Sequence, residues 1–356
     1  MLRARRSCVL LLSVMMISVA LLPASATITA RWSEVFLASG QWLDYDFTPS
    51  TTGEILLRLS LRPPQGSVAI RLSRQGEQTP VLDQIGSPSQ TVKAAVTEAD
   101  VGKVWLLRIT NVGQQTLEGR IELTFPRRYC VDITAQFRVR ISYEAGTELE
   151  DLHCQQLLSI LRSLPSDHIR RLRSIHAEPP SAFLYGYCYP PCTALIMPGL
   201  RAGRTFVLVA YHELGHTVHF TRLNADQQDR WEKLFNESGR DPDNFARDPI
   251  DRSLYAMTNQ YEDFAVTYSA YIANTQLYIT EAVARSQRAK PLLLQKFKIL
   301  LEIFHHTVEN QPRVYIYRVG TEAPTPRIER ASVPLTAEGL PDFEAQTTWE
   351  CFSLCS

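Results

Sequence analysis

The pentapeptide His212-Glu213-Leu214-Gly215-His216 lies inside a strongly apolar stretch, residues 204–220, that is predicted to be a buried helix. Residues four apart lie one turn apart on the same helix face, so both imidazoles can reach one metal ion. Glu213 is one residue round the helix from His212 and can reach an attacking water without binding the metal. The segment therefore predicts a metal centre. The alternative is an ordinary helix with two core or surface histidines.

A catalytic zinc usually has three protein ligands and an open fourth position for water, so a third ligand must come from elsewhere. The metzincin spacing is absent, because the glycine and the later histidine expected after His216 are missing. His219, three residues after His216, is interpreted as a residue that contacts substrate or core.

The best source of a third ligand is the segment 255–265, which contains adjacent acids at Glu262 and Asp263. These side chains point about 100° apart round a helix, so only one of them can face the histidines. Glu262 is favoured because it reaches further and shares a helix face with Ala265 and Ser269. Asp263 also fits an ordinary helix-start acid that the macrodipole favours. The choice between the two acids stays open.

These residues resemble the zinc peptidase domain of anthrax lethal factor and its extracellular bacterial relatives, a gluzincin group. The matching positions are His212, Glu213, Gly215, His216, Tyr255, Thr258, Asn259, Glu262, Phe264 and Ala265. The resemblance covers roughly residues 130–310 and implies a zincin-like metallopeptidase domain. It implies zinc ligands at His212, His216 and Glu262, a general base at Glu213 and a transition-state tyrosine at Tyr255. Asp263 in place of an aromatic residue, and Val266 in place of a frequent acid, are departures from the pattern.

Zinc acidifies water and polarises a scissile carbonyl, and Glu213 could move the proton from that water to the leaving amine. A phenol at Tyr255 could donate to the oxyanion, although a tyrosine here could also be a packing residue. We expect a secreted zinc endopeptidase that acts on a protein or peptide. One alternative is a non-catalytic extracellular binding or adhesion protein with a structural zinc site, and another is a hydrolase of a different bond.

Residues 1–26 have the three parts of a cleavable secretory signal peptide, with arginines at 3, 5 and 6, an apolar run and a small-residue site ending at Ala26. Their removal takes away three arginines and no acid, leaving 34 basic and 37 acidic side chains and a net charge of −3. This balance predicts no nucleic-acid partner. We expect a monomer without a membrane span.

Six cysteines follow residue 26, an even number typical of disulfides in an exported chain. Their short spacings favour Cys188–Cys192 and Cys351–Cys355, which leaves Cys130 for Cys154. The alternative for Cys188 and Cys192 is a thiolate metal site, but it lacks a second ligand pair.

The remaining sequence predicts an α+β fold in two parts and a tail. Alternating apolar residues at 43–47, 55–61, 105–109 and 121–125 predict strands of a β-sandwich accessory domain, residues 27–126. It is interpreted as a stabilising module or one that binds a cell surface or polymer. Strands at 135–143, 172–176, 182–187 and 193–197, and helices at 148–164 and between 204 and 306, build the zincin-like domain, residues 127–318. The strand at 193–197 could form a sheet edge that pairs with a peptide. Residues 319–356 predict an irregular Pro-rich tail.

Overall fold

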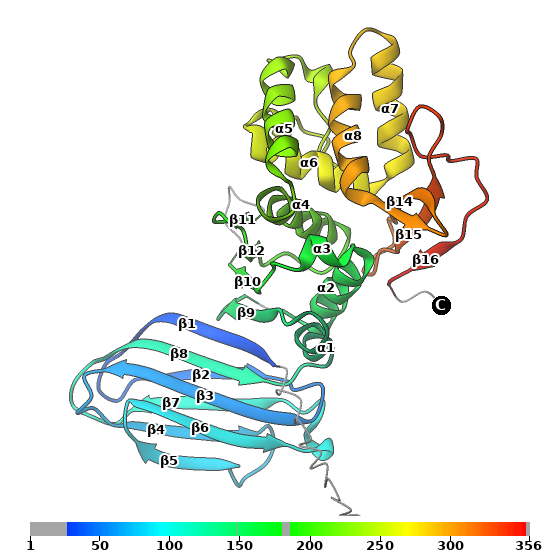
Figure 1. Cartoon of the computed structure of the whole chain (residues 1–356). Coiled ribbons are helices and arrows are strands. Elements are labelled where there is room, and N and C mark those ends of the chain that lie inside the picture. Colours follow the sequence, from blue (N-terminus) through cyan, green and yellow to red (C-terminus); the bar gives the residue numbers. More distant parts are fainter. Residues whose placement is uncertain (1–26, 148, 180–185, 354–356) are drawn as a thin grey trace, which may run out of the picture.

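The computed structural model describes residues 27–147, 149–179 and 186–353, and within them the chain has an α+β fold with several sheets (Figure 1). The signal peptide predicted for residues 1–26 lies outside the described residues. The first part contains β1 (Ile28–Leu37), β2 (Trp42–Phe47), β3 (Gly53–Arg62), β4 (Val68–Arg74), β5 (Leu82–Gly86), β6 (Ser89–Val96), η1 (Glu98–Asp100), β7 (Trp105–Asn111) and β8 (Leu117–Phe125).

These eight strands form two facing antiparallel layers, β1-β8-β3-β6 and β2-β7-β4-β5 (Figure 1). Alternate residues of β3 and β8 are buried between the layers, as period-two alternation requires. The ring of Phe47 on β2 lies 4.8 Å from that of Phe125 on β8, and Trp105 is fully buried. The four predicted strands are confirmed. The sequence pattern did not predict four further strands, β1, β4, β5 and β6.

The second part combines short strands with helices. Its elements are α1 (Arg128–Phe137), β9 (Arg140–Glu144), α2 (Asp151–Ser163), α3 (Ser166–Ile169), β10 (Ser174–Glu178), β11 (Tyr187–Cys188), β12 (Ala194–Pro198), α4 (Arg204–Thr221), α5 (Ala225–Ser238), η2 (Pro242–Asn244), η3 (Tyr255–Met257), α6 (Gln260–Ala273), α7 (Thr275–Gln287), α8 (Leu292–Phe304), β13 (His305–Val308), β14 (Gln311–Val319), β15 (Ile328–Pro334) and β16 (Trp349–Cys351). The predicted helices are confirmed to within a few residues.

Two predictions are wrong in this part. Residues 135–137 end helix α1 instead of beginning a strand, because Arg138 then turns the chain with a φ of 59°. The C-terminal segment is not irregular throughout. Strand β15 pairs with β14 and β16 in a four-stranded sheet, and alternate residues of β15 are buried.

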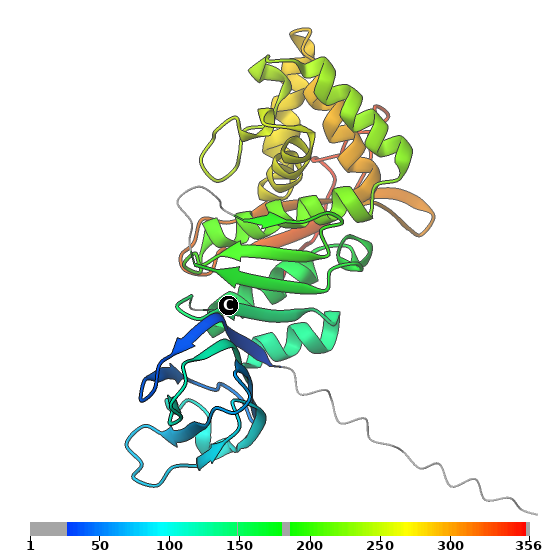
Figure 2. The ribbon, with the colours of Figure 1, turned by 90° about the vertical axis from the view of Figure 1, so that its left-hand side faces the viewer.

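The two parts share one eight-stranded sheet, of order β11-β12-β10-β9-β1-β8-β3-β6. The join is the parallel pairing of β1 with β9, from Ile28 opposite Ile141 to Arg31 opposite Glu144. Figure 2 shows β9, β10 and β12 between the N-terminal layers and the helices of the second part. The two parts on either side of the predicted boundary at residues 126–127 are therefore joined by one hydrogen-bonded sheet.

The segment predicted as an edge strand, residues 193–197, is not at the edge. Strand β12 pairs with β10 on one side and with β11 on the other, where Tyr187 lies opposite Ile196 and Cys188 opposite Leu195. Part of the predicted strand 182–187 lies outside the described residues. A peptide that adds to β12 would first have to displace β11.

Two of the predicted disulfides are present. Cys130–Cys154 links α1 to α2, and Cys188–Cys192 closes the turn between β11 and β12, so the alternative thiolate metal site there is wrong. The Cys351–Cys355 pair lies outside the described residues because Cys355 does. No helix in the described part of the chain is long and apolar enough to cross a bilayer. These features are compatible with an extracellular protein.

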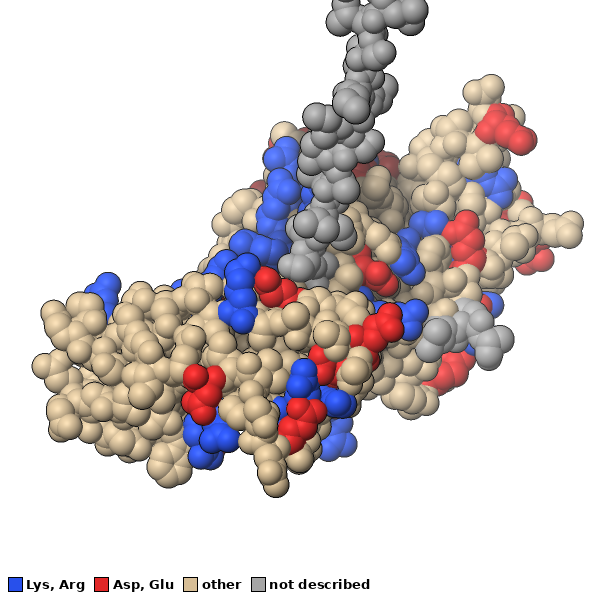
Figure 3. All heavy atoms as spheres, turned by 90° about the horizontal axis from the view of Figure 1, so that it is seen from below, with Lys and Arg blue, Asp and Glu red and all other residues tan. Residues whose placement is uncertain are grey.

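Charges of both signs lie close together on the face shown in Figure 3. On the N-terminal sheet, Arg31 pairs with Glu122 and Lys93 with Glu54. Such exposed pairs contribute little to stability, but they leave the sheet surface without a strong field of one sign.

A buried histidine connects three helices of the second part. His168 on α3 is fully buried; its Nε2 donates to the Ile303 carbonyl at 3.1 Å, and its Nδ1 accepts from the Tyr268 hydroxyl at 2.9 Å. Burial disfavours the imidazolium and lowers the pKa of His168 to about 4. The neutral ring is therefore part of the native packing.

The lowered pKa of His168 predicts that the protein loses stability in mild acid. Below pH 6.5 the unfolded chain takes up a proton that the folded His168 accepts only near pH 4, so the free energy of unfolding falls across that window by about 3 kcal/mol from this group. Urea unfolding at a series of pH values measures the slope. His168→Asn should flatten it and His305→Asn, on the exposed start of β13, should not. An unchanged slope in His168→Asn would contradict the prediction.

Candidate metal centre

Helix α4 carries the two histidines through the centre of the second part. Its residues from Phe206 to His219 are all buried, as expected for a helix that is apolar all round. His212 and His216 are each only 7% exposed, and their ring centroids lie 5.0 Å apart. The helical spacing thus brings the two imidazoles together, as predicted.

Helix α6 brings the third donor from fifty residues along the chain. It begins after Asn259, whose Oδ1 accepts from the backbone N–H groups of Tyr261 and Glu262 at 2.9 and 3.0 Å. This N-cap places Glu262 in the first turn. Its Oε2 lies 3.0 Å from Nε2 of His212 and 3.4 Å from Nε2 of His216.

The three side chains satisfy a simple test of fit for a metal. One ligand atom from each of His212, His216 and Glu262 lies within 4.8 Å of the others. Burial opposes ionisation of Glu262, but hydrogen bonds from the two imidazoles overcome that effect and lower its pKa. Two imidazole nitrogens and an ionised carboxylate oxygen form a donor set suited to a divalent transition metal.

Gly215 allows the close approach of α4 and α6. A Cβ at this position would lie 2.9 Å from the Cα of Ala265 and 3.3 Å from the Cβ of Tyr268. Real Cβ atoms do not approach backbone this closely, so the interface requires glycine here. Because Gly215 lies between His212 and His216 in α4, the same contact sets the distance from both histidines to Glu262.

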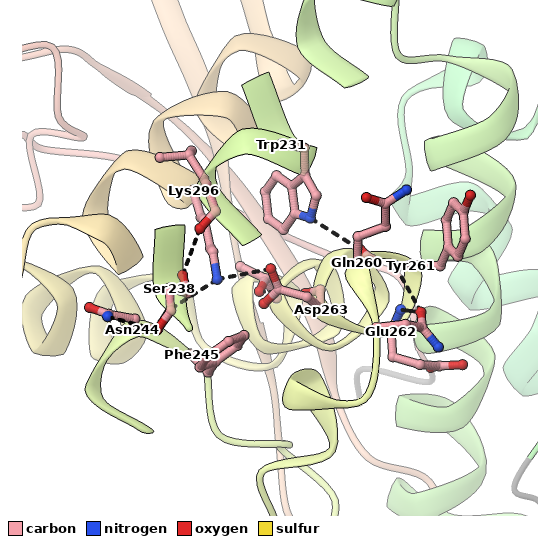
Figure 4. Close-up of polar contacts among 12 residues, drawn as sticks. Trp231, Ser238, Asn244, Phe245, Gln260, Tyr261, Glu262, Asp263 and Lys296 are labelled. Atoms are coloured by element: carbon pink, nitrogen blue, oxygen red, sulfur yellow. Dashed lines mark hydrogen bonds and ion pairs between the residues drawn. The ribbon is translucent and has the colours of Figure 1, made fainter. Parts of the chain in front are cut away.

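Asp263 points to a different side of α6 from Glu262, into a buried ion pair with Lys296 (Figure 4). Its carboxylate lies 2.9 Å from Nζ of Lys296 on α8, and neither side chain is exposed. Lys296 also donates to the Asn244 carbonyl at 2.9 Å and lies 4.0 Å from the ring centroid of Phe245. Burial raises the pKa of Asp263 to about 6, against the opposing effect of Lys296. Glu262 and not Asp263 therefore faces His212 and His216.

Glu213 lies next to the ligand atoms and is nearly completely buried, at 1% exposure. Its Oε2 has no hydrogen-bond partner in the described part of the chain. Burial raises the pKa of Glu213 to about 7, with His212 acting against the shift and Glu262 adding to it. The backbone at Gly186 covers the carboxylate so closely that a Cβ there would lie 2.5 Å from Oε1. A buried carboxylate without a partner is costly and is often functional.

Two further aromatic residues surround the centre. Tyr255, on η3, is 41% exposed and its ring centroid is 6.0 Å from that of His212. Burial, helped by the charges of Glu262 and Glu213, raises the pKa of Tyr255 to about 12, so its hydroxyl stays a donor at neutral pH. His219 is buried against the rings of Tyr261 and Phe264 and belongs to the packing around the site.

A cavity of about 220 Å³ opens beside His212, Glu213 and Tyr255. Asp248, from the loop between η2 and η3, lines it and is only 6% exposed. No sequence pattern marks Asp248, Lys296 or Gly186 as residues of this region, because they come from separate segments without a motif. Only the three-dimensional fold brings them to the cavity and to α6.

Comparisons with known proteins assign no family. No protein-family model and no curated protein matches the chain. Weak likenesses exist among solved structures: a Yersinia pseudotuberculosis-derived mitogen (TM-score 0.23, 12% identity, 28% of this chain and 87% of that one) and a family GH115 4-O-methyl-α-glucuronidase (0.20, 12%, 27% and 14%). A functionally unknown conserved protein from Bacillus anthracis str. Ames has a TM-score of 0.17 at 11% identity, over 78% of this chain and 75% of that one. This chain thus spans a small part of the glucuronidase, and none of the three likenesses bears on the fold or function.

Gly215→Ala tests the helix contact. Helix propensity alone would stabilise the variant by about 1 kcal/mol. The clash with Ala265 predicts the reverse, a loss of about 1–3 kcal/mol in the free energy of unfolding, together with a zinc affinity lower by about tenfold or more. Urea unfolding and chelator competition measure the two effects. A more stable variant with unchanged zinc affinity would show that the contact between the two helices does not require glycine at this position.

Glu262→Gln and Asp263→Asn separate the two neighbouring acids. Glu262→Gln should weaken zinc binding by more than about 100-fold, since substitutions outside the ligand shell already cost about 10–100-fold. Asp263→Asn should retain zinc but lose about 3–5 kcal/mol of stability, because Lys296 stays buried without its partner. Equilibrium dialysis and urea unfolding distinguish these outcomes.

The double variant Asp263→Leu, Lys296→Met is the control for the buried pair. It removes both charges and should recover most of the stability lost in Asp263→Asn, with zinc binding intact. Zinc binding that survives Glu262→Gln but disappears in both Asp263 variants would reverse the assignment of the two acids.

Proposed function

We propose that the protein is a secreted zinc-dependent endopeptidase, with the metal held by His212, His216 and Glu262. One observation carries the proposal: three donors from two helices converge within 4.8 Å, and the buried Glu213, whose Oε2 has no hydrogen-bond partner among the described residues, lies next to them on the wall of a cavity. A metal site used only for stability has no need of that glutamate. Hydrolysis does need it, because a base must stand beside the attacking water.

Zinc is the metal that suits this donor set best. Two histidines and one glutamate are a ligand combination of catalytic zinc, which keeps a fourth position open. Structural zinc is instead closed by four protein ligands. Among the described residues, the group of His, Cys, Asp and Glu side chains at the centre has only three members, which favours the catalytic alternative over an adhesion protein with structural zinc.

Each protein group has a defined part in the proposed reaction. A zinc ion held by His212, His216 and Glu262 would supply Lewis acidity, which would polarise the scissile carbonyl and acidify water. Glu213 accepts the water's proton on its carboxylate and then delivers it to the leaving amine nitrogen. Burial raises the pKa of Glu213, which suits a group that must take a proton from water and then give it up. Tyr255 keeps its proton and donates a hydrogen bond to the oxyanion that develops on the carbonyl oxygen.

The same proposal includes an identity for each of the two parts of the chain. Residues 127–318 form a zincin-like metallopeptidase domain similar to that of anthrax lethal factor, and residues 27–126 a β-sandwich accessory domain. Support for the first comes from the motif positions His212, His216 and Glu262, whose donor atoms converge as that resemblance requires. Support for the second comes from the two facing layers with their shared aromatic core. Export through the signal peptide at residues 1–26 agrees with two disulfides.

Glu213→Gln is the decisive variant for the reaction. The amide cannot take the proton from water, so hydrolysis of a peptide library by the zinc-loaded protein should fall by about 10²–10⁴-fold. Zinc content should stay at one ion per chain, because Glu213 is not a ligand. Cleavage by mass spectrometry and metal content by elemental analysis provide the two readouts.

A matched substitution at an exposed glutamate, Glu232→Gln on α5, controls for the loss of a negative charge and should leave both values unchanged. Cleavage at the wild-type rate by Glu213→Gln would remove this residue from the mechanism. A wild-type protein that binds zinc yet cleaves no peptide would favour the adhesion alternative.

A further inference from the structure

The cavity beside Glu213 has a chemical character of its own. Val209 and Ile250 give it apolar walls, while Glu213, Asp248 and Asp251 bring three carboxylates, and Tyr255 completes the side next to the metal centre. No lysine or arginine is among the described residues that line it. The lining of the cavity therefore combines acidic and apolar side chains.

Asp248 is held in place by the backbone around it. Its Oδ1 accepts from the N–H of Ile250 at 2.8 Å, and its own N–H donates to the Ser253 carbonyl at 3.0 Å. The loop is closed further by the N–H of Arg252, which donates to the Asp248 carbonyl at 2.8 Å. The carboxylate is thus fixed in direction by a tight turn.

No cation of the described chain neutralises Asp248. Three arginines whose side chains bond near this loop are engaged elsewhere. Arg204 donates to the Pro249 carbonyl at 3.4 Å, Arg252 to the Tyr278 hydroxyl at 3.2 Å, and Arg285 to the Phe245 carbonyl at 3.0 Å. No ion pair joins a lysine or arginine to Asp248 among the described residues, although it is only 6% exposed. A buried carboxylate of this kind gains most from a partner that arrives from outside.

We propose that this cavity receives the side chain of a lysine or arginine that flanks the scissile bond, with Asp248 as the acceptor of its charged group. The inference rests on the proposed peptidase function and names its substrate class. The apolar walls would cover the methylene stem of such a side chain, and the carboxylate of Asp248 would meet the ammonium or guanidinium at its end. Acidic side chains are repelled, and a neutral one leaves Asp248 buried without a cation.

The test uses two peptides that differ only in lysine or norleucine at the residue flanking the cleaved bond. Norleucine keeps the stem and lacks the ammonium group. The wild-type zinc protein should cleave the lysine peptide with kcat/KM higher by about tenfold or more, which corresponds to about 1.4 kcal/mol. Asp248→Asn should remove this preference by slowing the lysine peptide alone. The asparagine oxygen can still accept from the N–H of Ile250, so the turn is kept.

Asp342→Asn is the matched control, because Asp342 Oδ1 accepts from the N–H of Glu344 at 3.0 Å in a similar turn that does not line the cavity. It should keep the full lysine preference. If Asp248→Asn fails to fold, Asp251→Asn at the exposed carboxylate of the same cavity replaces it, with a smaller loss of preference expected. An equal preference in all variants would overturn the assignment of Asp248.

A binding measurement separates this inference from the peptidase proposal. Fluorescence anisotropy of the labelled lysine and norleucine peptides on Glu213→Gln should give a dissociation constant lower by about tenfold for lysine, and the difference should shrink at high salt. Wild-type cleavage of both peptides at equal rates would overturn the inference and leave the peptidase standing. Lysine-selective binding that depends on Asp248, with no cleavage by the wild type, would support the cavity and overturn the peptidase.

Discussion

The contact between Gly215 and Ala265 is the constraint on which the centre depends. Two histidines on one helix lie along a single face and do not enclose a metal ion by themselves. The third donor must come from a second helix at the right distance. The absence of a Cβ at Gly215 lets α6 approach α4 closely enough for Glu262 to reach both imidazoles. A single methyl group at this point would separate the donors, because buried helices cannot compress further.

Rotation of α6 about its own axis is determined by a different interaction. Asp263 follows Glu262 in sequence and pairs with Lys296 on the side of α6 that faces α8. Trp231 strengthens this orientation by donating from Nε1 to the Gln260 carbonyl at 3.2 Å. Asp263 is thus paired with the buried Lys296, whereas Glu262 faces the two histidines of the candidate metal site. Adjacent carboxylates acquire opposite environments, and their pKa values shift in opposite directions.

Local patterns predicted much of the structure and much of the site. Helix α4 and the spacing of His212 and His216 depend on residues close in sequence, so the sequence pattern alone predicts them. The same is true of the alternating strands β2, β3, β7 and β8. The choice between Glu262 and Asp263 needed Lys296, which is 33 residues further on and carries no motif. Asp248 could not be predicted from a motif either, because a loop of the folded chain brings it to the same cavity as Glu213. The pairing of β1 with β9 depends on long-range packing that no local pattern contains.

The parallel pairing of β1 with β9 also limits how far the N-terminal part of the chain can separate from the second part. Cutting the peptide chain near residue 126 would leave β1 hydrogen-bonded to β9, so the N-terminal layers would stay attached after cleavage. A shortened protein that starts after them would expose the backbone of β9 as a bare sheet edge, a template for self-association. The N-terminal part therefore covers the strands beneath the candidate metal centre, and cleavage of the chain at this linker would not release it.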